Sequence, residues 1–306
     1  MSRNVYSKHF FFKTQLSSSE NIEKFSNLRT TDSSNFLEFT LDDSDGKTAI
    51  KIELPEDVKV GTLAKDYYPI ESDAQFVVDI TPNRIDAASH YGVARDLNAF
   101  FSIHKPGKYQ LSKPDVSNFK VENNSNPYKI TVDSADACPR YTAVTISGVE
   151  VKESPEWLKE ALQSIGIRSI NNVVDVTNYV MMAMGQPLHA YDADEIAGKH
   201  VIVKSMPKGT KFTTLDGVER ELDERDLMVC DENGPMCIAG VFGGKGSGTY
   251  DSTKNVVLES AYFHPTWIRK SARRHGLSTD ASFRFERGID PNGTIYALKQ
   301  AALMAK

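Results

Sequence analysis

The chain has 306 residues, of which 40% are hydrophobic and 25% are charged. This composition excludes a wholly disordered chain, and the length predicts about two domains. The formal net charge of −5 excludes a basic surface over the whole molecule, so any contact with nucleic acid must be local. No stretch approaches the roughly 20 apolar residues of a membrane span, and the N-terminus lacks the apolar core of a signal peptide. We therefore expect a cytoplasmic protein without a membrane partner.

The first 45 residues are rich in Ser, Asn and Thr and contain no recognisable element. The alternation of apolar and polar residues over 48–54 predicts a strand, and the apolar run 76–80 predicts a buried strand. Residues 85–101 place most of their apolar side chains on one face and predict a helix. The segment 105–127 holds three prolines and little apolar periodicity, which predicts a linker and a domain boundary.

The rest of the chain is more regularly patterned. Strands are predicted at 141–151, 200–206 and 255–263. The stretch 172–185 is apolar and fits either a helix or a strand. Three helices are predicted: one introduced by the Ser154-Pro155 cap and ended by Gly166, with Trp157, Leu158, Leu162 and Ile165 facing inward, one from Pro265 to Gly276, and one over 294–306.

The order of these elements predicts the fold class. Strands and helices mix without a steady βαβ alternation, which is typical of an α+β protein. The last predicted helix reaches Lys306 without a C-terminal cap, which suggests a truncated chain or one that continues. The three cysteines, Cys138, Cys230 and Cys237, form no CxxC pair and are too few for a disulfide framework. We expect them to be small buried side chains.

A glycine-rich segment covers residues 239–248. It does not match a phosphate-binding loop, because Ala239 stands at the first glycine position and Lys245 is followed by Gly246. Two interpretations remain open, a plain turn or a wall of backbone beside a ligand.

His189 and Glu259 are the candidate reactive residues. His189 lies in an apolar stretch and is either a hydrogen-bonded core residue or a reactive group with partners, for which Glu259 and Arg168 are the candidates. Glu259 lies within an apolar strand, where a carboxylate is costly unless it is paired, faces a pocket or points outward. The sequence contains neither a nucleophile elbow nor an HExxH motif, so it does not support a covalent or metal-dependent mechanism.

The segment 264–288 is the most basic part of the chain. It contains six arginines and lysines, against two acidic residues. Arg269 and Arg273 are four residues apart and share one helical face. The segment is either a solvated helix face or a local phosphate-binding patch in an otherwise acidic protein.

Six blocks of this sequence together resemble the β subunit of bacterial phenylalanyl-tRNA synthetases. The resemblance implies an unassigned segment 1–45, a partial N-terminal module 46–110, a linker 111–127 and a larger tRNA-editing domain 128–306. The oligonucleotide-binding barrel of that family is not recognisable in this chain. The blocks are DITPNRIDAASHYGVARDL (79–97), PRYTAVTISGVEV (139–151), GIRSINNVVDVTNYVMMAMGQPLHAYD (166–192), CIAGVFGGKGSG (237–248), VVLESAYF (256–263) and ARRHGLSTDASFRFERGIDP (272–291).

The resemblance also implies roles for individual residues. Glu259 matches the glutamate that binds the hydroxyl of tyrosine, and His189 matches a histidine near the ester bond to be cut. Thr279 and Ala281 match residues beside the amino acid, and Gly243 is a backbone contact. Arg168 matches an arginine near the terminal adenosine, and Arg269, Arg273 and Arg274 are candidate contacts to tRNA phosphates.

The activity implied by the resemblance is hydrolysis of tyrosine misattached to phenylalanine tRNA. An activated water would attack the ester, and either the histidine or a ribose hydroxyl of the tRNA would assist it. The aminoacylation site belongs to the α subunit of a heterotetramer, so we expect no aminoacylation by this chain alone. ATP and Mg²⁺ are implied for the complete enzyme, and neither a cofactor nor a metal for this chain. The alternatives are a non-catalytic module that binds the tRNA or the α subunit, and an unrelated nucleic-acid-binding protein.

Overall fold

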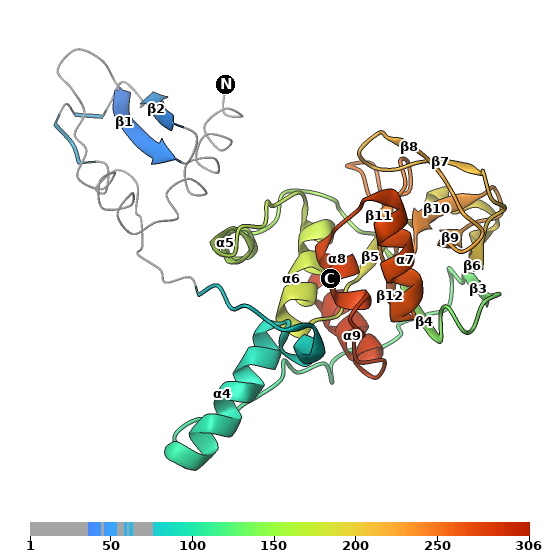
Figure 1. The fold of residues 1–306 in the computed structure, drawn as a ribbon, viewed down its shortest axis with the longest axis horizontal. Coiled ribbons are helices and arrows are strands. Elements are labelled where there is room, and N and C mark those ends of the chain that lie inside the picture. The colour runs from blue at the N-terminus through green and yellow to red at the C-terminus, as the bar shows by residue number, and fades with distance from the viewer. Residues whose placement is uncertain (1–35, 44–45, 54–57, 60, 64–75) are drawn as a thin grey trace. The chain divides into compact units, whose positions relative to one another are not determined.

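The computed structural model describes residues 36–43, 46–53, 58–59, 61–63 and 76–306. The chain divides into two compact units, one made of Met1–Val77 with Gln163–Arg168 and the other of Val78–Leu162 with Ser169–Lys306. In the first unit, β1 (Phe36–Asp43) and β2 (Gly46–Glu53) form an antiparallel hairpin (Figure 1). The strand predicted at 48–54 is confirmed within β2. β1 lies within the first 45 residues, for which the sequence indicated no element. The predictions for residues 1–35 lie outside the described residues.

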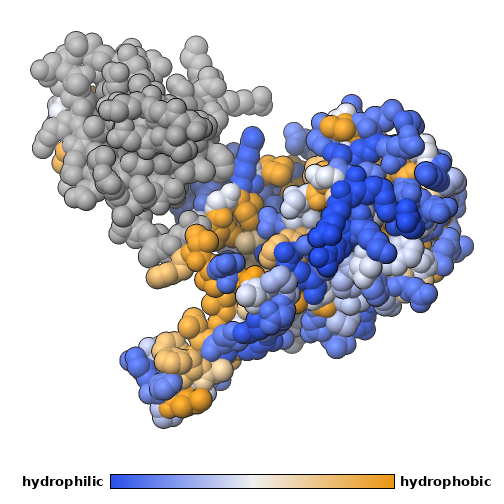
Figure 2. Space-filling view, viewed as in Figure 1, coloured by the Kyte–Doolittle hydropathy of each residue, from blue (hydrophilic) through white to orange (hydrophobic). Residues whose placement is uncertain are grey.

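The prediction of a buried strand at 76–80 is wrong. These residues pair with no strand in the described part of the chain, and Phe76 and Val77 are exposed. The helix predicted from Ile85 begins later, because Pro82–Ala87 forms a 3₁₀ turn (η1) and the Ser89 side chain caps α4 (His90–His104). Figure 2 shows hydrophobic residues gathered along α4. The apolar face is thus only partly covered, and its exposed members include Leu97, Phe100 and Ile103.

Residues 105–127 contain neither a helix nor a strand, as the linker prediction requires. They nevertheless belong to the second unit and run against α9 (Gly293–Ala305), where the Tyr296 hydroxyl donates to the carbonyl of Pro114 and Lys306 pairs with Glu122. The segment is therefore anchored to the fold. The predicted domain boundaries at 45, 110 and 127 stay predictions.

Two sheets form the centre of the second unit, and together with the helices they confirm the α+β class. In the five-stranded sheet β3 and β6 are parallel and the other neighbours antiparallel, whereas the three-stranded sheet is antiparallel throughout. The strand order in the five-stranded sheet is β11 (Phe242–Gly243), β10 (Pro235–Ile238), β9 (Leu227–Cys230), β6 (His200–Ser205), β3 (Lys129–Val132). The strand order in the three-stranded sheet is β4 (Arg140–Ser147), β12 (Asn255–Tyr262), β5 (His189–Asp192).

Side chains along β12 alternate between the two faces of its sheet and so define three layers. Val256 and Leu258 face α9 and α6 (Asn172–Met184), and Ser260 donates to the carbonyl of Thr294 in α9 at 2.8 Å. Val257 and Ala261 point the other way, into the core that includes residues of the five-stranded sheet. Glu259 lies two positions from each of these residues along the strand, so its side chain points the same way, into the space between the two sheets.

The remaining elements complete the unit. The ambiguous stretch 172–185 is helical, since Asn171 caps α6 and Gly185 ends it in a left-handed conformation. In α5 (Glu156–Ser164) Leu158 and Leu162 are buried as predicted, but Trp157 is exposed, which corrects that prediction. The other elements are η2 (Ala193–Glu195), η3 (Ala197–Lys199), β7 (Lys211–Thr213), β8 (Glu219–Glu221), α7 (Pro265–His275) and α8 (Asp280–Phe285).

The three cysteines are free and buried, as expected. Among the described residues, every helix is too short or too polar to cross a lipid bilayer.

Candidate functional site

The register of the three-stranded sheet brings the candidate residues together. On β12, Glu259 lies directly opposite His189 of β5 and Ala143 of β4. Residues opposite one another in an antiparallel sheet, and those two positions along, share a face. Tyr141 and Tyr191 therefore lie on the same face as Glu259. The four polar side chains therefore share the face that lies between the two sheets.

Glu259 is buried, with 6% of its surface exposed. Its Oε2 accepts a hydrogen bond from the Tyr141 hydroxyl at 2.7 Å and another from the Tyr191 hydroxyl at 3.0 Å. Burial raises the pKa of Glu259 to about 7, although both hydrogen bonds act in the opposite direction. The outward-facing alternative for this strand glutamate is thus wrong. The carboxyl group sits between the layers and can change its protonation near neutral pH.

His189 is the second group of the site; the residue is half-buried, and its Nε2 is buried. Its Nε2 has no hydrogen-bond partner in the described part of the chain, and its ring lies edge-on to that of Tyr191 with centroids 4.4 Å apart. Burial lowers the pKa of His189 to about 4, so the imidazole is neutral at physiological pH. A buried nitrogen without a partner is costly. It is satisfied when a water or a ligand reaches it.

Replacement of Glu259 by glutamine should stabilise the fold at alkaline pH. The folded-state pKa of about 7 exceeds the ordinary 4.5, so the carboxyl favours folding most below pH 4.5, and that contribution declines as pH rises through 7. Glutamine cannot ionise yet keeps an oxygen for both phenols. We expect Glu259→Gln to gain about 2–3 kcal/mol at about pH 8 and little near pH 5.

Urea unfolding at the two pH values measures this difference. Glu224→Gln is the control, because Glu224 is exposed. Equal stability of Glu259→Gln and the parent chain at the higher pH would show that the carboxyl ionises without cost.

The glycine-rich segment reaches the site at Gly243. A β-carbon built there would lie 2.8 Å from Cδ1 of Leu215 and 3.4 Å from Cε1 of His189. Only glycine fits such an approach without displacing Leu215. The segment is more than a plain turn, because Phe242 and Gly243 pair with β10 and Gly244 bridges to Thr214. Its backbone lies beside the imidazole, which favours the ligand-wall interpretation.

Thr279 connects α8 to the glycine-rich segment. Its hydroxyl accepts from the amide of Ser282 and donates to the carbonyl of Val241, both at 3.0 Å. Thr279 is thus the N-cap of α8, a role that the Thr-x-x-Ser pattern could have revealed. Ala281 is partly buried and packs against the core. Both residues stay candidates for contacts with an amino acid.

A cavity of about 270 Å³ opens beside the site. Its wall includes Tyr191 together with Lys245, Gly246 and Ser247 of the glycine-rich segment. Glu259 and His189 do not line it. Tyr191 is thus the residue that the cavity and the buried carboxyl have in common.

Arg168 is exposed and belongs to the first unit. Its predicted role near an adenosine stays a prediction.

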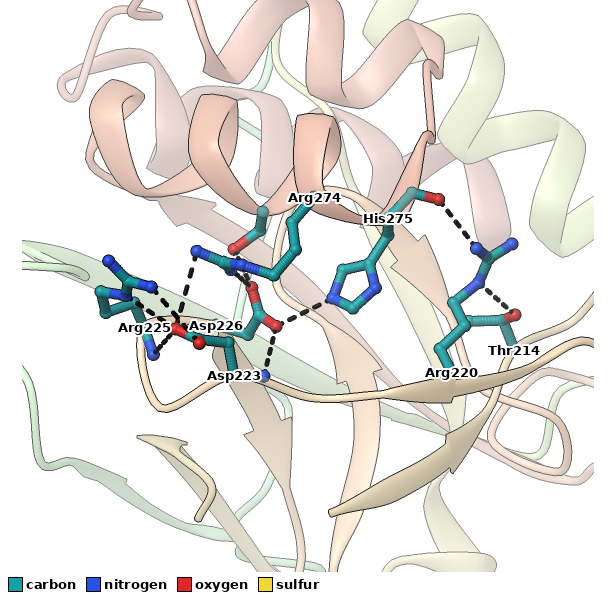
Figure 3. Close-up of polar contacts among 8 residues, drawn as sticks. Thr214, Arg220, Asp223, Arg225, Asp226, Arg274 and His275 are labelled. Atoms are coloured by element: carbon teal, nitrogen blue, oxygen red, sulfur yellow. Dashed lines mark hydrogen bonds and ion pairs between the residues drawn. The ribbon is translucent and has the colours of Figure 1, made fainter. Parts of the chain in front are cut away.

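The basic segment separates into two groups in the structure. Arg269 and Arg273 are exposed on α7 and form no ion pair in the part of the chain that is described. Arg274 instead pairs with the fully buried Asp226, which His275 also contacts through Nε2 at 2.8 Å (Figure 3). Arg274 therefore has a structural partner within the chain, whereas Arg269 and Arg273 remain available to an external phosphate.

Three residues were missed by the sequence analysis. Tyr141 lies in a predicted strand and Tyr191 in a stretch for which no strand was predicted, and their meeting at one carboxylate depends on a register that a single sequence does not reveal. Asp226 lies in the polar stretch 221–226, which carries no signal that distinguishes a buried carboxylate from a solvated one.

Comparisons with known proteins place residues 137–306 in a family described as B3/4 domain. The chain is similar to a protein named phenylalanine–tRNA ligase beta subunit from Bacteroides fragilis, with 63% identity over 255 residues that make up 83% of this chain and 31% of the relative. A protein of the same name from Porphyromonas gingivalis is 54% identical over 253 residues, covering 82% of this chain and 30% of the relative. The chain thus spans about a third of the length of these relatives.

A solved N-terminal fragment of the phenylalanyl-tRNA synthetase beta-subunit from Pyrococcus horikoshii also matches. It is 15% identical, with a TM-score of 0.36, and the match covers 86% of this chain and 72% of that one. A likeness this distant supports no argument.

Proposed function

The chain belongs to the B3/4 domain family, and we propose that it is the editing part of a phenylalanine–tRNA ligase β subunit, hydrolysing tyrosine mischarged on phenylalanine tRNA. The observation that carries this proposal is the buried Glu259 opposite a neutral His189 with an unpartnered nitrogen. The names of the relatives support the same assignment. Partnership with an α subunit in a heterotetramer, and the use of ATP and Mg²⁺ by the complete enzyme, belong to this proposal.

The need for a second site follows from energetics. A pocket built for phenylalanine rejects an analogue that merely adds a hydroxyl by only about 10²-fold. A site that demands the hydroxyl can supply the rest. When phenylalanine occupies it, the buried acceptor on Glu259 is left unpaired, at a cost of about 1–3 kcal/mol. That cost corresponds to roughly 10- to 100-fold discrimination against the cognate ester.

The proposed reaction is direct hydrolysis. Water attacks the ester carbonyl, and backbone amides of the glycine-rich segment near Gly243 stabilise the oxyanion. The neutral imidazole of His189 orients the water or accepts its proton, unless a ribose hydroxyl of the tRNA takes the proton instead. Thr279 and Ala281 border the amino acid, and Arg168 contacts the terminal adenosine.

Replacement of Glu259 by alanine tests the assignment. We expect the ratio of tyrosyl to phenylalanyl ester hydrolysis to fall roughly 10- to 100-fold, because the acceptor for the phenol is lost. The measurement is deacylation of the two charged tRNAs by the same preparation. Glu224→Ala, at an exposed position, is the matched control. An unchanged ratio in Glu259→Ala would refute the assignment, and no deacylation by the parent chain would favour a non-catalytic binding module.

Contacts with tRNA should be weak and local. The net charge of −5 opposes binding to a polyanion. We therefore expect weak binding at physiological salt, with a dissociation constant in the micromolar range or higher. Simultaneous replacement of Arg269 and Arg273 by alanine should reduce the slope of log K against log salt by about 1.5–2. Filter binding across a salt series measures it. Arg225→Ala is the control, because Arg225 already pairs with Asp223. If the double variant changes the slope no more than Arg225→Ala does, the tRNA phosphates do not bind at Arg269 and Arg273.

A further inference from the structure

We propose that Tyr141 and Tyr191 are positioning residues for Glu259: together they occupy its Oε2 and leave Oε1 as the acceptor for the hydroxyl of a ligand. The proposal rests on the proposed function and adds residues that determine its specificity. It starts from the observation that both phenols donate to the same oxygen, at 2.7 and 3.0 Å.

The two phenols approach from opposite sides. Tyr141 is on β4 and Tyr191 on β5, the two neighbours of β12, so the Glu259 carboxyl is held from both flanks. A carboxylate oxygen accepts about two hydrogen bonds, and Oε2 therefore has no capacity left. Within the described part of the chain no donor reaches Oε1. A ligand hydroxyl that enters the site must bind there, which fixes the direction from which a third phenol can approach.

Among the groups around Glu259, the two tyrosines are the ones that favour its ionised form. The neutral imidazole of His189 lies opposite on β5. The Cys138 thiol, in the segment before β4, and the Cys237 thiol, on β10, are also near the carboxyl. Burial raises the pKa of both thiols, so they stay neutral. No cation among the described residues pairs with Glu259. The phenols are thus the groups that favour the ionised carboxylate, against burial, which raises its pKa to about 7.

Removal of either hydroxyl should therefore favour the protonated carboxyl, which accepts the hydroxyl of a ligand less well. The variants Tyr141→Phe and Tyr191→Phe keep the rings and remove one hydrogen bond each. Tyr128→Phe is the matched control, because the Tyr128 hydroxyl donates to the carbonyl of Ala193 at 2.6 Å and does not reach Glu259. Circular dichroism establishes that each variant folds.

The primary measurement is infrared titration of the full chain carrying ¹³C-labelled glutamate, without substrate. We expect the midpoint of the buried carboxyl, identified by its absence in Glu259→Gln, to rise by about one pH unit in each phenylalanine variant and to stay unchanged in the control. The tyrosyl-to-phenylalanyl hydrolysis ratio at neutral pH should fall up to about tenfold and recover at higher pH. A merely structural role would move neither the midpoint nor the pH at which the ratio recovers.

Replacing all tyrosines by 3-fluorotyrosine provides a test that removes no ring and no hydroxyl. The more acidic phenols donate more strongly, so the midpoint should fall. An unmoved midpoint in both phenylalanine variants and in the fluorinated protein would overturn the positioning role, even if the parent chain hydrolyses the ester. Shifted midpoints without any hydrolysis by the parent chain would count against the proposed function and leave the positioning of Glu259 intact.

Discussion

Replacement of His189 by alanine is expected to slow hydrolysis of the tyrosyl and phenylalanyl esters alike, by about 10²–10⁴-fold. In the proposed reaction, the unpartnered buried nitrogen of the imidazole serves the reacting water, and Glu259 alone distinguishes the two amino acids. The loss should therefore fall on kcat for both substrates, whereas loss of Glu259 changes their ratio. Single-turnover deacylation of both charged tRNAs separates the two patterns. His104→Ala, at the exposed end of α4, is the control.

The pH dependence sharpens this test. Burial lowers the pKa of His189 to about 4, so its neutral form persists down to that pH. Burial raises the pKa of Glu259 to about 7, so the carboxylate is lost as pH falls through 7. We expect phenylalanyl ester hydrolysis to stay level between about pH 5 and pH 8, while the preference for the tyrosyl ester declines in the lower part of that range. A loss of phenylalanyl ester hydrolysis centred near pH 6.5 would show that the imidazole titrates as a solvated one.

The parts of the site that could be predicted from the sequence are those that follow from local chemistry. A charged residue in an apolar strand is costly unless it has partners, and Glu259 is buried with partners, as that argument requires. Its pairing with His189, 70 positions away in the chain, depends on the register of β5 against β12. That register is a property of the whole sheet. For the same reason the two tyrosines could not be assigned to the carboxyl.

The errors have a related cause. The apolar run at 76–80 has the composition of a strand, yet it has no partner strand among the described residues. Trp157 lies on the predicted inner face of α5 but is exposed, because the burial of a helix position depends on what packs against it. Caps are local, and some were predicted: Pro265 begins α7 and Gly276 ends it. The Ser154 cap was wrong, because α5 begins at Glu156 and the Ser154 hydroxyl donates to Asp175 instead. The basic segment was predicted by composition alone, which does not separate Arg274 from Arg273.

Replacement of Asp226 by alanine should destabilise the second unit by about 3–5 kcal/mol. The Asp226 carboxylate is fully buried and accepts from Ser271 at 2.6 Å and from Arg274, with Nε2 of His275 at 2.8 Å (Figure 3). Its removal leaves the Arg274 guanidinium without its closest partner. Chemical denaturation measures the loss, and Asp251→Ala, at an exposed position, is the matched control.

The sign of the pH dependence provides a second criterion for Asp226. Although burial opposes it, hydrogen bonds from His275 and Ser271 hold the pKa of this carboxyl below its ordinary value. Its contribution to stability is therefore complete above pH 3.8 and declines as pH falls below that value. Asp226→Asn keeps the shape but not the charge, so its deficit should shrink in acid. If Asp226→Ala loses less than about 1 kcal/mol of unfolding free energy at neutral pH, Asp226 contributes no more than a partner in an ordinary surface ion pair. In that case α7, with Arg269 and Arg273, would be held by its apolar face and by contacts such as the hydrogen bond from Arg220 to the carbonyl of His275.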